Sequence, residues 1–71
     1  MFIKVTEIRE NIKFCEESEF ETIQQYINSD IIKIIYPSNR VGNTSIQFSD
    51  GSFIYVKEKV EELCHKLGLE E

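Results

Sequence analysis

The polar segment 38–43 holds the residues best suited to bind an anion. Arg40 carries a planar guanidinium with five N–H donors, which matches the geometry of a phosphate or a carboxylate. Asn39, Gly42 and Asn43 tolerate left-handed backbone conformations that expose main-chain amides. The same residue types also make ordinary connections between strands, which is the simpler interpretation. Asn39, Arg40 and Asn43 are the candidate contacts for a small anionic ligand.

Other nucleophiles and metal ligands are few. The chain has one histidine, His65, and two cysteines, Cys15 and Cys64. Neighbouring residues of a helix point about 100° apart, so Cys64 and His65 do not face one metal ion. No phosphate-binding glycine loop, dinucleotide fingerprint or zinc-protease motif occurs. We therefore expect no metal, no cofactor and no enzymatic activity. Two free thiols in a reducing cytoplasm are the expected state of the cysteines, with a disulfide between them as the alternative.

Acidic residues outnumber basic ones by 13 to 8, which gives a net charge of −5. This balance, with no basic run, argues against nucleic-acid binding. The carboxylates gather in two places. Charges at the start of a helix, which the helix dipole favours, are the simplest explanation of the first group. A solvated helix surface is the simplest explanation of the second, and a protein-binding surface is the alternative for both. The candidate partner contacts are Glu16, Glu17, Glu19 and Glu21 in the first group and Glu58, Glu61 and Glu62 in the second.

The elements that carry these residues fit one domain, 1–71, because 71 residues have room for a single small core. Ser18 and Glu21 stand in the S-x-x-E arrangement of a capping box, which predicts a helix over 19–28. The apolar residues of that segment recur at helical spacing. They are Phe20, Ile23 and Ile27.

The remaining segments predict a mostly antiparallel sheet. Runs rich in β-branched and aromatic residues predict strands at 2–8, 12–15, 31–36, 44–48 and 53–56. Asp50-Gly51 predicts a two-residue type I′ hairpin. In that register Phe48 faces Phe53 and Ile46 faces Tyr55, so these four residues form one buried cluster.

Segment 58–68 has the apolar spacing of an amphipathic helix that ends at Gly68. The predicted fold is therefore α+β: a small, mostly antiparallel sheet of four or five strands with an inserted helix and a C-terminal helix. A core this small is often stabilised by oligomerisation. Two short helices do not cover every apolar face of such a sheet. The sequence thus predicts a homodimer or larger homo-oligomer, with an interface at Ile35, Ile54 and Val56.

Three short motifs resemble a known family. Segment 27–35 reads INSDIIKII and resembles the INxDxIxxI stretch of the small FlbD-like proteins, which are short bacterial and phage chains. Segment 2–6 resembles their first strand, and 50–62 resembles their closing DGxxxxVKExVEE segment. In that family the first strand leads almost directly into the IN segment, whereas here 9–26 intervene. The resemblance implies a small sheet with a C-terminal helix and a non-enzymatic protein, often of phage or mobile-element origin.

These observations predict a small acidic binding protein, encoded by a phage or mobile element, that inhibits or regulates a larger host protein as anti-defence proteins do. The alternative is an oligomer that binds or sequesters a nucleotide-like small molecule. No apolar run approaches the roughly 20 residues that a bilayer requires, and Lys4 is not followed by the apolar stretch of a signal peptide. We therefore expect no membrane partner and a cytoplasmic location, which is the host cytoplasm if a phage encodes the chain.

Overall fold

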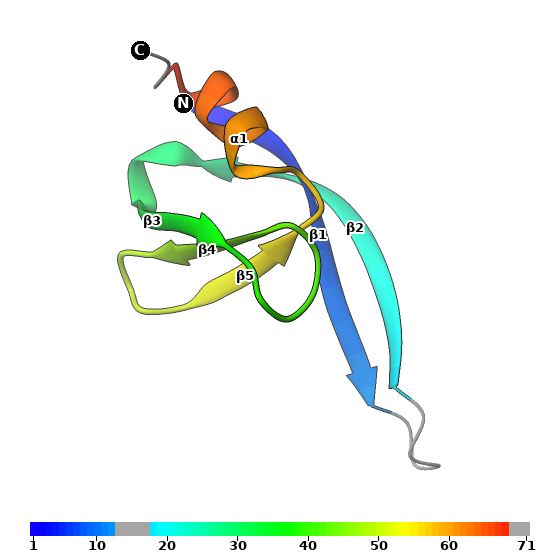
Figure 1. Ribbon diagram of the computed structural model, residues 1–71. Coiled ribbons are helices and arrows are strands. Elements are labelled where there is room, and N and C mark those ends of the chain that lie inside the picture. Colours follow the sequence, from blue (N-terminus) through cyan, green and yellow to red (C-terminus); the bar gives the residue numbers. More distant parts are fainter. Residues whose placement is uncertain (13–17, 69–71) are drawn as a thin grey trace.

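The computed structural model describes residues 1–12 and 18–68, which form a five-stranded antiparallel sheet and one C-terminal helix (Figure 1). The described part of the chain is thus α+β and mostly sheet. The order of strands in the sheet is β2-β1-β5-β4-β3, so β2 and β3 are its edges. The elements are β1 (Phe2–Ile12), β2 (Ser18–Asn28), the 3-10 turn η1 (Ser29–Ile31), β3 (Ile32–Pro37), β4 (Thr44–Phe48), β5 (Phe53–Val56) and α1 (Val60–Leu67).

The predicted inserted helix over 19–28 is wrong, because this segment is the strand β2. Ile23 and Ile27 are four residues apart, a spacing that places them on one side of a helix and also on one face of a strand. The structure selects the strand because β1 pairs with β2 along all eleven residues, from Phe2 with Asn28 to Ile12 with Ser18. Long-range pairing therefore outweighs a local capping signal.

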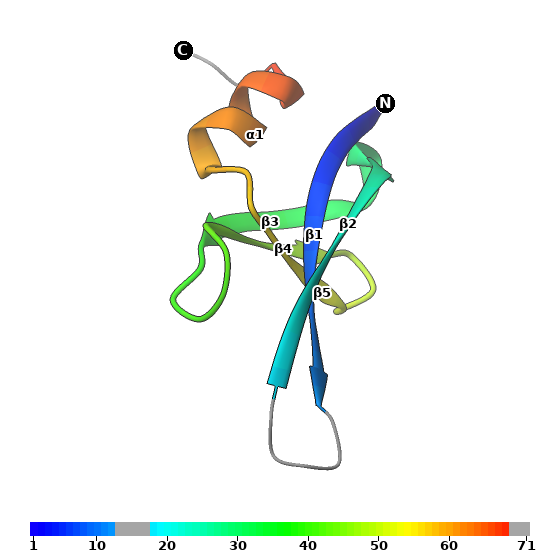
Figure 2. The same cartoon turned by 90° about the vertical axis from the view of Figure 1, so that its right-hand side faces the viewer.

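The β1–β2 hairpin extends beyond the rest of the sheet (Figure 2). β5 pairs with β1 only at Glu7 and Ile8, so beyond these residues β1 and β2 form a two-stranded ribbon. The predicted short strand at 12–15 falls mostly outside the described residues, as does Cys15. Ile12 itself is the last residue of β1 rather than the start of a new strand.

The β4–β5 hairpin is present at the predicted place but has a different register. Phe48 N–H donates to the Ser52 carbonyl at 2.8 Å, and Gly51 N–H donates to the Phe48 carbonyl at 3.0 Å. These bonds enclose a three-residue loop in which Gly51 has φ +92°. Relative to a two-residue turn, the register moves by one residue and Ile46 pairs with Ile54.

This register separates the predicted four-residue cluster, because a one-residue slip sends side chains to the other face. Ile46 and Phe48 are buried. Phe53 and Tyr55 lie on the opposite face, where Phe53 is exposed and Tyr55 is half-buried. The expectation of one buried cluster of Ile46, Phe48, Phe53 and Tyr55 is therefore wrong, and Ile54 takes the place that Tyr55 was expected to fill.

The sheet consequently has two unlike faces. We call the face that α1 packs against the covered face, and the opposite one the reverse face. The covered face and α1 supply the buried hydrophobic core: Ile3, Val5, Ile27, Ile46, Phe48, Val56 and Leu63. By strand alternation the reverse face carries Ile34, Tyr36, Ser45, Gln47, Phe53 and Tyr55, and it continues onto Ile8, Phe20, Thr22, Gln24 and Tyr26 of the β1–β2 hairpin.

The C-terminal helix forms as its sequence predicts. α1 ends at Gly68, which has a left-handed backbone with φ +72° and donates its N–H to the carbonyls of Cys64 and His65. Leu63 is fully buried against the sheet. The Lys66 ammonium donates to the Lys4 carbonyl of β1 at 2.7 Å, which ties the last turn of the helix to the sheet.

Candidate functional site

The 38–43 loop is held firmly at the border of the reverse face. Ser38 N–H donates to the Asn43 carbonyl at 3.2 Å, and the Ser38 hydroxyl donates to the Val41 carbonyl at 2.7 Å. Gly42 has φ +68°, and a Cβ at this position would lie 2.5 Å from the Val56 carbonyl oxygen. Only glycine fits there, because both the backbone conformation and the close approach exclude a side chain.

The three residues predicted to bind a ligand lie together on this loop, but two of them have structural partners. Arg40 Nη2 lies 2.7 Å from Glu10 Oε2, an ion pair that links the loop to the β1–β2 ribbon. Asn43 Nδ2 donates to the Lys57 carbonyl at 2.6 Å. Asn39 is exposed. The loop therefore links distant segments of the chain. A ligand that binds Arg40 would compete with Glu10 for its guanidinium group.

A hollow of about 430 Å³ adjoins this loop, which supplies one wall. Its base comes from β1 and β2, and an exposed lysine stands at its side. A mixed apolar and cationic lining suits an anion with a flat apolar part. The lining residues are Ile8, Phe20, Thr22, Val41, Gly42 and Lys57.

An aromatic patch covers the reverse face over the three strands β3, β4 and β5. Tyr36 pairs with Ser45, and Ser45 pairs with Tyr55, so the two tyrosines flank one serine. Phe53 packs edge-on against Tyr55, with ring centroids 5.5 Å apart and planes at 82°. Ile34 lies in the adjacent row of the same face. We call Ile34, Tyr36, Phe53 and Tyr55 the aromatic patch.

The side chains of the aromatic patch are largely open to solvent. Ile34 is 45%, Tyr36 43% and Phe53 53% exposed. Ser45 beneath them is only 1% exposed, and its hydroxyl has no hydrogen-bond partner among the described residues. Large apolar side chains clustered at the surface of a small protein are typical of an interaction site.

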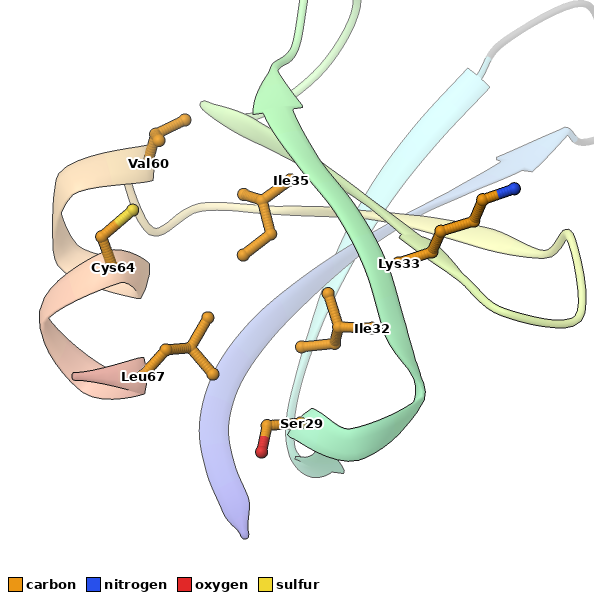
Figure 3. Close-up of a pocket in the computed structure, with 7 residues that line it drawn as sticks. All are labelled: Ser29, Ile32, Lys33, Ile35, Val60, Cys64 and Leu67. Atoms are coloured by element: carbon orange, nitrogen blue, oxygen red, sulfur yellow. The ribbon is translucent and has the colours of Figure 1, made fainter. Parts of the chain in front are cut away.

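The second hollow lies on the other side of the sheet, between α1 and β3 (Figure 3). Its volume is about 450 Å³, and its lining is mostly apolar. Val60, Cys64 and Leu67 of the helix face Ile32 and Ile35 of β3 across it, whereas the Lys33 side chain is directed away from the helix. Cys64 is a free cysteine in this groove.

The predicted interface residues are largely used by the fold of the single chain. Val56 is fully buried, which removes it from the surface that a partner can reach. Ile35 and Ile54 are half-buried and pack against the hydrophobic core under α1. The predicted interface of Ile35, Ile54 and Val56 therefore belongs to the covered face, and the open apolar surface is on the reverse face.

Of the second acidic group, Glu58 has a structural role. Its Oε1 accepts a hydrogen bond from the Thr6 amide at 2.8 Å. Burial tends to raise the pKa of the Glu58 carboxyl, but hydrogen bonds from Thr6 and from its own backbone, with the charge of Lys66, outweigh burial and lower it. Glu61 and Glu62 are exposed in the first turn of α1, as a solvated helix surface requires.

The first acidic group does not start a helix. Glu21 is exposed on β2 and pairs with Arg9 across the ribbon. Glu16 and Glu17 fall outside the described residues, and for Glu19 only the backbone in β2 is described. No helix-start explanation therefore applies to Glu19 and Glu21.

One buried carboxylate was not singled out by the sequence. Glu7 is 6% exposed and accepts hydrogen bonds from Arg9 Nε at 2.9 Å and from the Gln25 amide. The hydrogen bond and ion pair with Glu7 raise the pKa of the Arg9 guanidinium. Alternation along β1 places Glu7 on the covered face next to Val5, but nothing in the local sequence indicates the partner on β2.

Within residues 1–12 and 18–68, no group of three His, Cys, Asp or Glu side chains is arranged to hold a metal ion. In the same part of the chain, no helix combines the length and apolar character needed to cross a membrane. Comparison of the chain with family models, with curated proteins and with solved structures gives no match. Membership of the FlbD-like family therefore stays a prediction.

Proposed function

We propose that this chain is a small non-enzymatic protein-binding module that regulates a larger protein through its aromatic patch. The observation that supports this proposal is the exposure, on one face of the sheet, of Ile34 and Tyr36 on β3 and of Phe53 on β5, the two strands that flank β4. Tyrosine and phenylalanine are enriched in protein interfaces because they bury a large area while few rotamers are lost. A rigid sheet holds these side chains in place before binding, which reduces the entropy lost on association.

The distribution of charged residues also supports the aromatic patch as the binding surface. The aromatic patch itself has no charged side chain, and the polar residues between its members are Ser45 and Gln47. The exposed carboxylates Glu61 and Glu62 lie on α1, across the sheet from the patch. A partner that binds the patch therefore desolvates few charges at the centre of the interface. The acidic side chains of α1 would affect the rate at which a charged partner associates.

The test compares capture of interaction partners by two matched variants. Tagged parent, Phe53→Ser and Phe2→Ser proteins are mixed with extract of the source cells, and bound proteins are quantified by mass spectrometry. Phe2 is 67% exposed at the start of β1, away from the aromatic patch. We expect a partner that binds the parent and Phe2→Ser but not Phe53→Ser. Equal capture by all three proteins contradicts the proposal.

The hollow beside the 38–43 loop favours a second function, the binding of a nucleotide-like small molecule. Its lining joins an aromatic ring, Phe20, with the ammonium group of Lys57, and the adjoining loop carries Arg40. A flat base can stack on a ring while a phosphate pairs with cations. To bind the ligand, Arg40 would have to break its ion pair with Glu10 and pair with the phosphate instead.

A thermal-shift screen against nucleotides separates the two functions. If the hollow binds a nucleotide, the shift disappears in Lys57→Gln and in Arg40→Ala. It remains in Lys59→Gln, which alters an exposed lysine that does not line the hollow. A shift that survives both substitutions places the ligand elsewhere, and the absence of any shift leaves protein binding as the function.

A further inference from the structure

The two edges of the sheet differ in how open they are to a further strand. Ser38 N–H donates to the Asn43 carbonyl, at the end of the β3–β4 pairing. Because every second residue of an antiparallel strand bonds to the same neighbour, Tyr36 and Ile34 also bond to β4. Pro37 therefore faces the free edge, where it offers no N–H donor. A register irregularity between Ile32 and Ile34 and the charge of Lys33 further interrupt this edge. Such features are the usual protection against strand addition.

The β2 edge has none of these protections between Thr22 and Ile27. Lys57 N–H donates to the Thr6 carbonyl. By alternation, the N–H and C=O groups of Thr6 and Ile8 bond to β5, and those of the residues between them bond to β2. On β2 the residues paired with those intervening positions bond inward. The alternate residues present their N–H and C=O groups to the free edge: Phe20, Thr22, Gln24 and Tyr26.

The occupant that fits this edge is a second copy of the chain. The chain has a net charge of −5, so two copies repel each other overall. Segment 22–27 reads TIQQYI and carries no charged side chain. It is therefore a stretch at which two copies can approach without opposing like charges.

The side chains of β2 are also self-complementary. In an antiparallel pairing with the two-fold axis at Ile23, Phe20 lies opposite Tyr26 of the second copy, and Thr22 lies opposite Gln24. Phe20 is 53% and Tyr26 67% exposed on the reverse face, so the pairing covers two exposed aromatic residues of each chain. Glu21 then lies opposite Gln25 rather than opposite another carboxylate.

We propose that two copies of this chain pair their β2 strands antiparallel about Ile23, which joins the two five-stranded sheets into one continuous sheet. The pairing supports the region that is weakest in the single chain. Beyond Ile8 the β1–β2 ribbon has only two strands, and isolated two-stranded ribbons are marginally stable in water. The second copy supplies a third strand along part of this ribbon. This proposal is independent of the aromatic patch and of the partner that binds there.

The first test is a disulfide placed at the two-fold axis. Cys15 and Cys64 are replaced by serine, and Ile23→Cys or Ile35→Cys is introduced. Ile23 bonds inward to β1, so the two copies of residue 23 form a non-hydrogen-bonded pair with Cα atoms about 4.5 Å apart, close enough for a disulfide. Ile35 is the matched control on the β3 edge. We expect a covalent dimer of twice 8.4 kDa for Ile23→Cys only.

The second test removes one intermolecular hydrogen-bond donor from each copy, and therefore two symmetry-related bonds from the dimer. The Gln24 N–H points to the free edge, so Gln24→Pro leaves the bonds to β1 in place and removes only a donor to the second copy. Light scattering should give a dimer for the parent and for Gln24→Ala, and a mass near 8.4 kDa for Gln24→Pro with an unchanged circular dichroism spectrum. A parent that is monomeric at high micromolar concentration, or a dimer that cross-links through residue 35, overturns the proposal. If Gln24→Pro unfolds, the cross-linking result alone decides.

Discussion

The two faces of the sheet are made by the same strands but differ in side chains and in exposure. The covered face is aliphatic, and Val5, Ile46 and Val56 on it are fully buried beneath α1. The reverse face carries Tyr36 and Phe53, which are about half exposed. An eight-residue helix covers only one side of a five-stranded sheet. The difference indicates that stability depends on the covered face, whereas the reverse face is available for binding.

The strongest test of this division is Leu63→Ala. Leu63 is the fully buried contact of α1 with the covered face. Its truncation leaves a cavity and should lower the free energy of unfolding by about 2–5 kcal/mol, measured by urea denaturation. Phe53→Ala removes more atoms from the reverse face, yet it should lower that free energy by less than about 1 kcal/mol. Equal losses would show that the two faces contribute alike.

Gly42→Ala tests the loop that adjoins the reverse face. The new methyl group would lie 2.5 Å from the Val56 carbonyl oxygen and 2.7 Å from Ile8 Cδ1, at a positive φ. We expect a loss of about 1–3 kcal/mol in the free energy of unfolding. Gly51→Ala is the matched control, because Gly51 also has positive φ but a Cβ added there would have no atom within 4 Å. It should lose less, and the reverse order would contradict the packing of this loop.

The sequence predicted the helix, the antiparallel sheet and the position of the β4–β5 turn, because each depends on local patterns. It missed the hairpin register, since Asp50-Gly51 fits both a two-residue turn and a three-residue loop with glycine last. That one-residue difference decides which residues are exposed. Phe53 and Tyr55 were therefore expected in the core, and the aromatic patch could not be predicted from periodicity alone.

The helix expected over 19–28 failed for a related reason. Local spacing fits helix and strand alike, and only the eleven-residue pairing with β1 decides between them. Similarly, the 38–43 loop was recognisable as a polar turn with Arg40. Its pairing with Glu10, thirty residues away in sequence, was not. Contacts between distant segments thus set both the fold and the chemistry available at the site.

The free energy of unfolding should depend on acidic pH through Glu58, which lies just before α1, the helix that covers one face of the sheet. The native pKa of Glu58 is lowered, because hydrogen bonds from Thr6 and its own backbone outweigh the effect of burial. The folded state therefore binds this proton less readily than the unfolded state, whose glutamates titrate near pH 4.3. The stabilisation is present above that pH and is lost as the pH falls through the lower native value.

Urea denaturation between neutral and acidic pH checks this linkage. Glu58→Gln should weaken the acid dependence of the free energy of unfolding, because the side chain no longer titrates. Glu61→Gln alters an exposed carboxylate in the first turn of α1, three residues further along the chain, and should leave the dependence close to that of the parent. A parent-like acid dependence in Glu58→Gln would assign the effect to other carboxylates.

The smallest expected effects come from two adjacent hydroxyl groups on opposite faces. Thr44 on the covered face is fully buried, and its hydroxyl donates to the Glu58 carbonyl at 2.6 Å. Ser45 on the reverse face is equally buried, but its hydroxyl has no partner within the described part of the chain. Removing a bonded hydroxyl loses a favourable interaction, whereas removing an unbonded one relieves a desolvation penalty.

Thr44→Val should therefore lower the free energy of unfolding by about 1 kcal/mol, and Ser45→Ala should raise it by up to about 1 kcal/mol. For a domain of this size, 1 kcal/mol corresponds to a change of about 4–8 °C in Tm, which calorimetry resolves. The opposite signs follow from the contacts on the two faces, since both residues are buried β4 positions one step apart. A loss of stability in Ser45→Ala would show that this hydroxyl is bonded, and it would remove the contrast between the two residues.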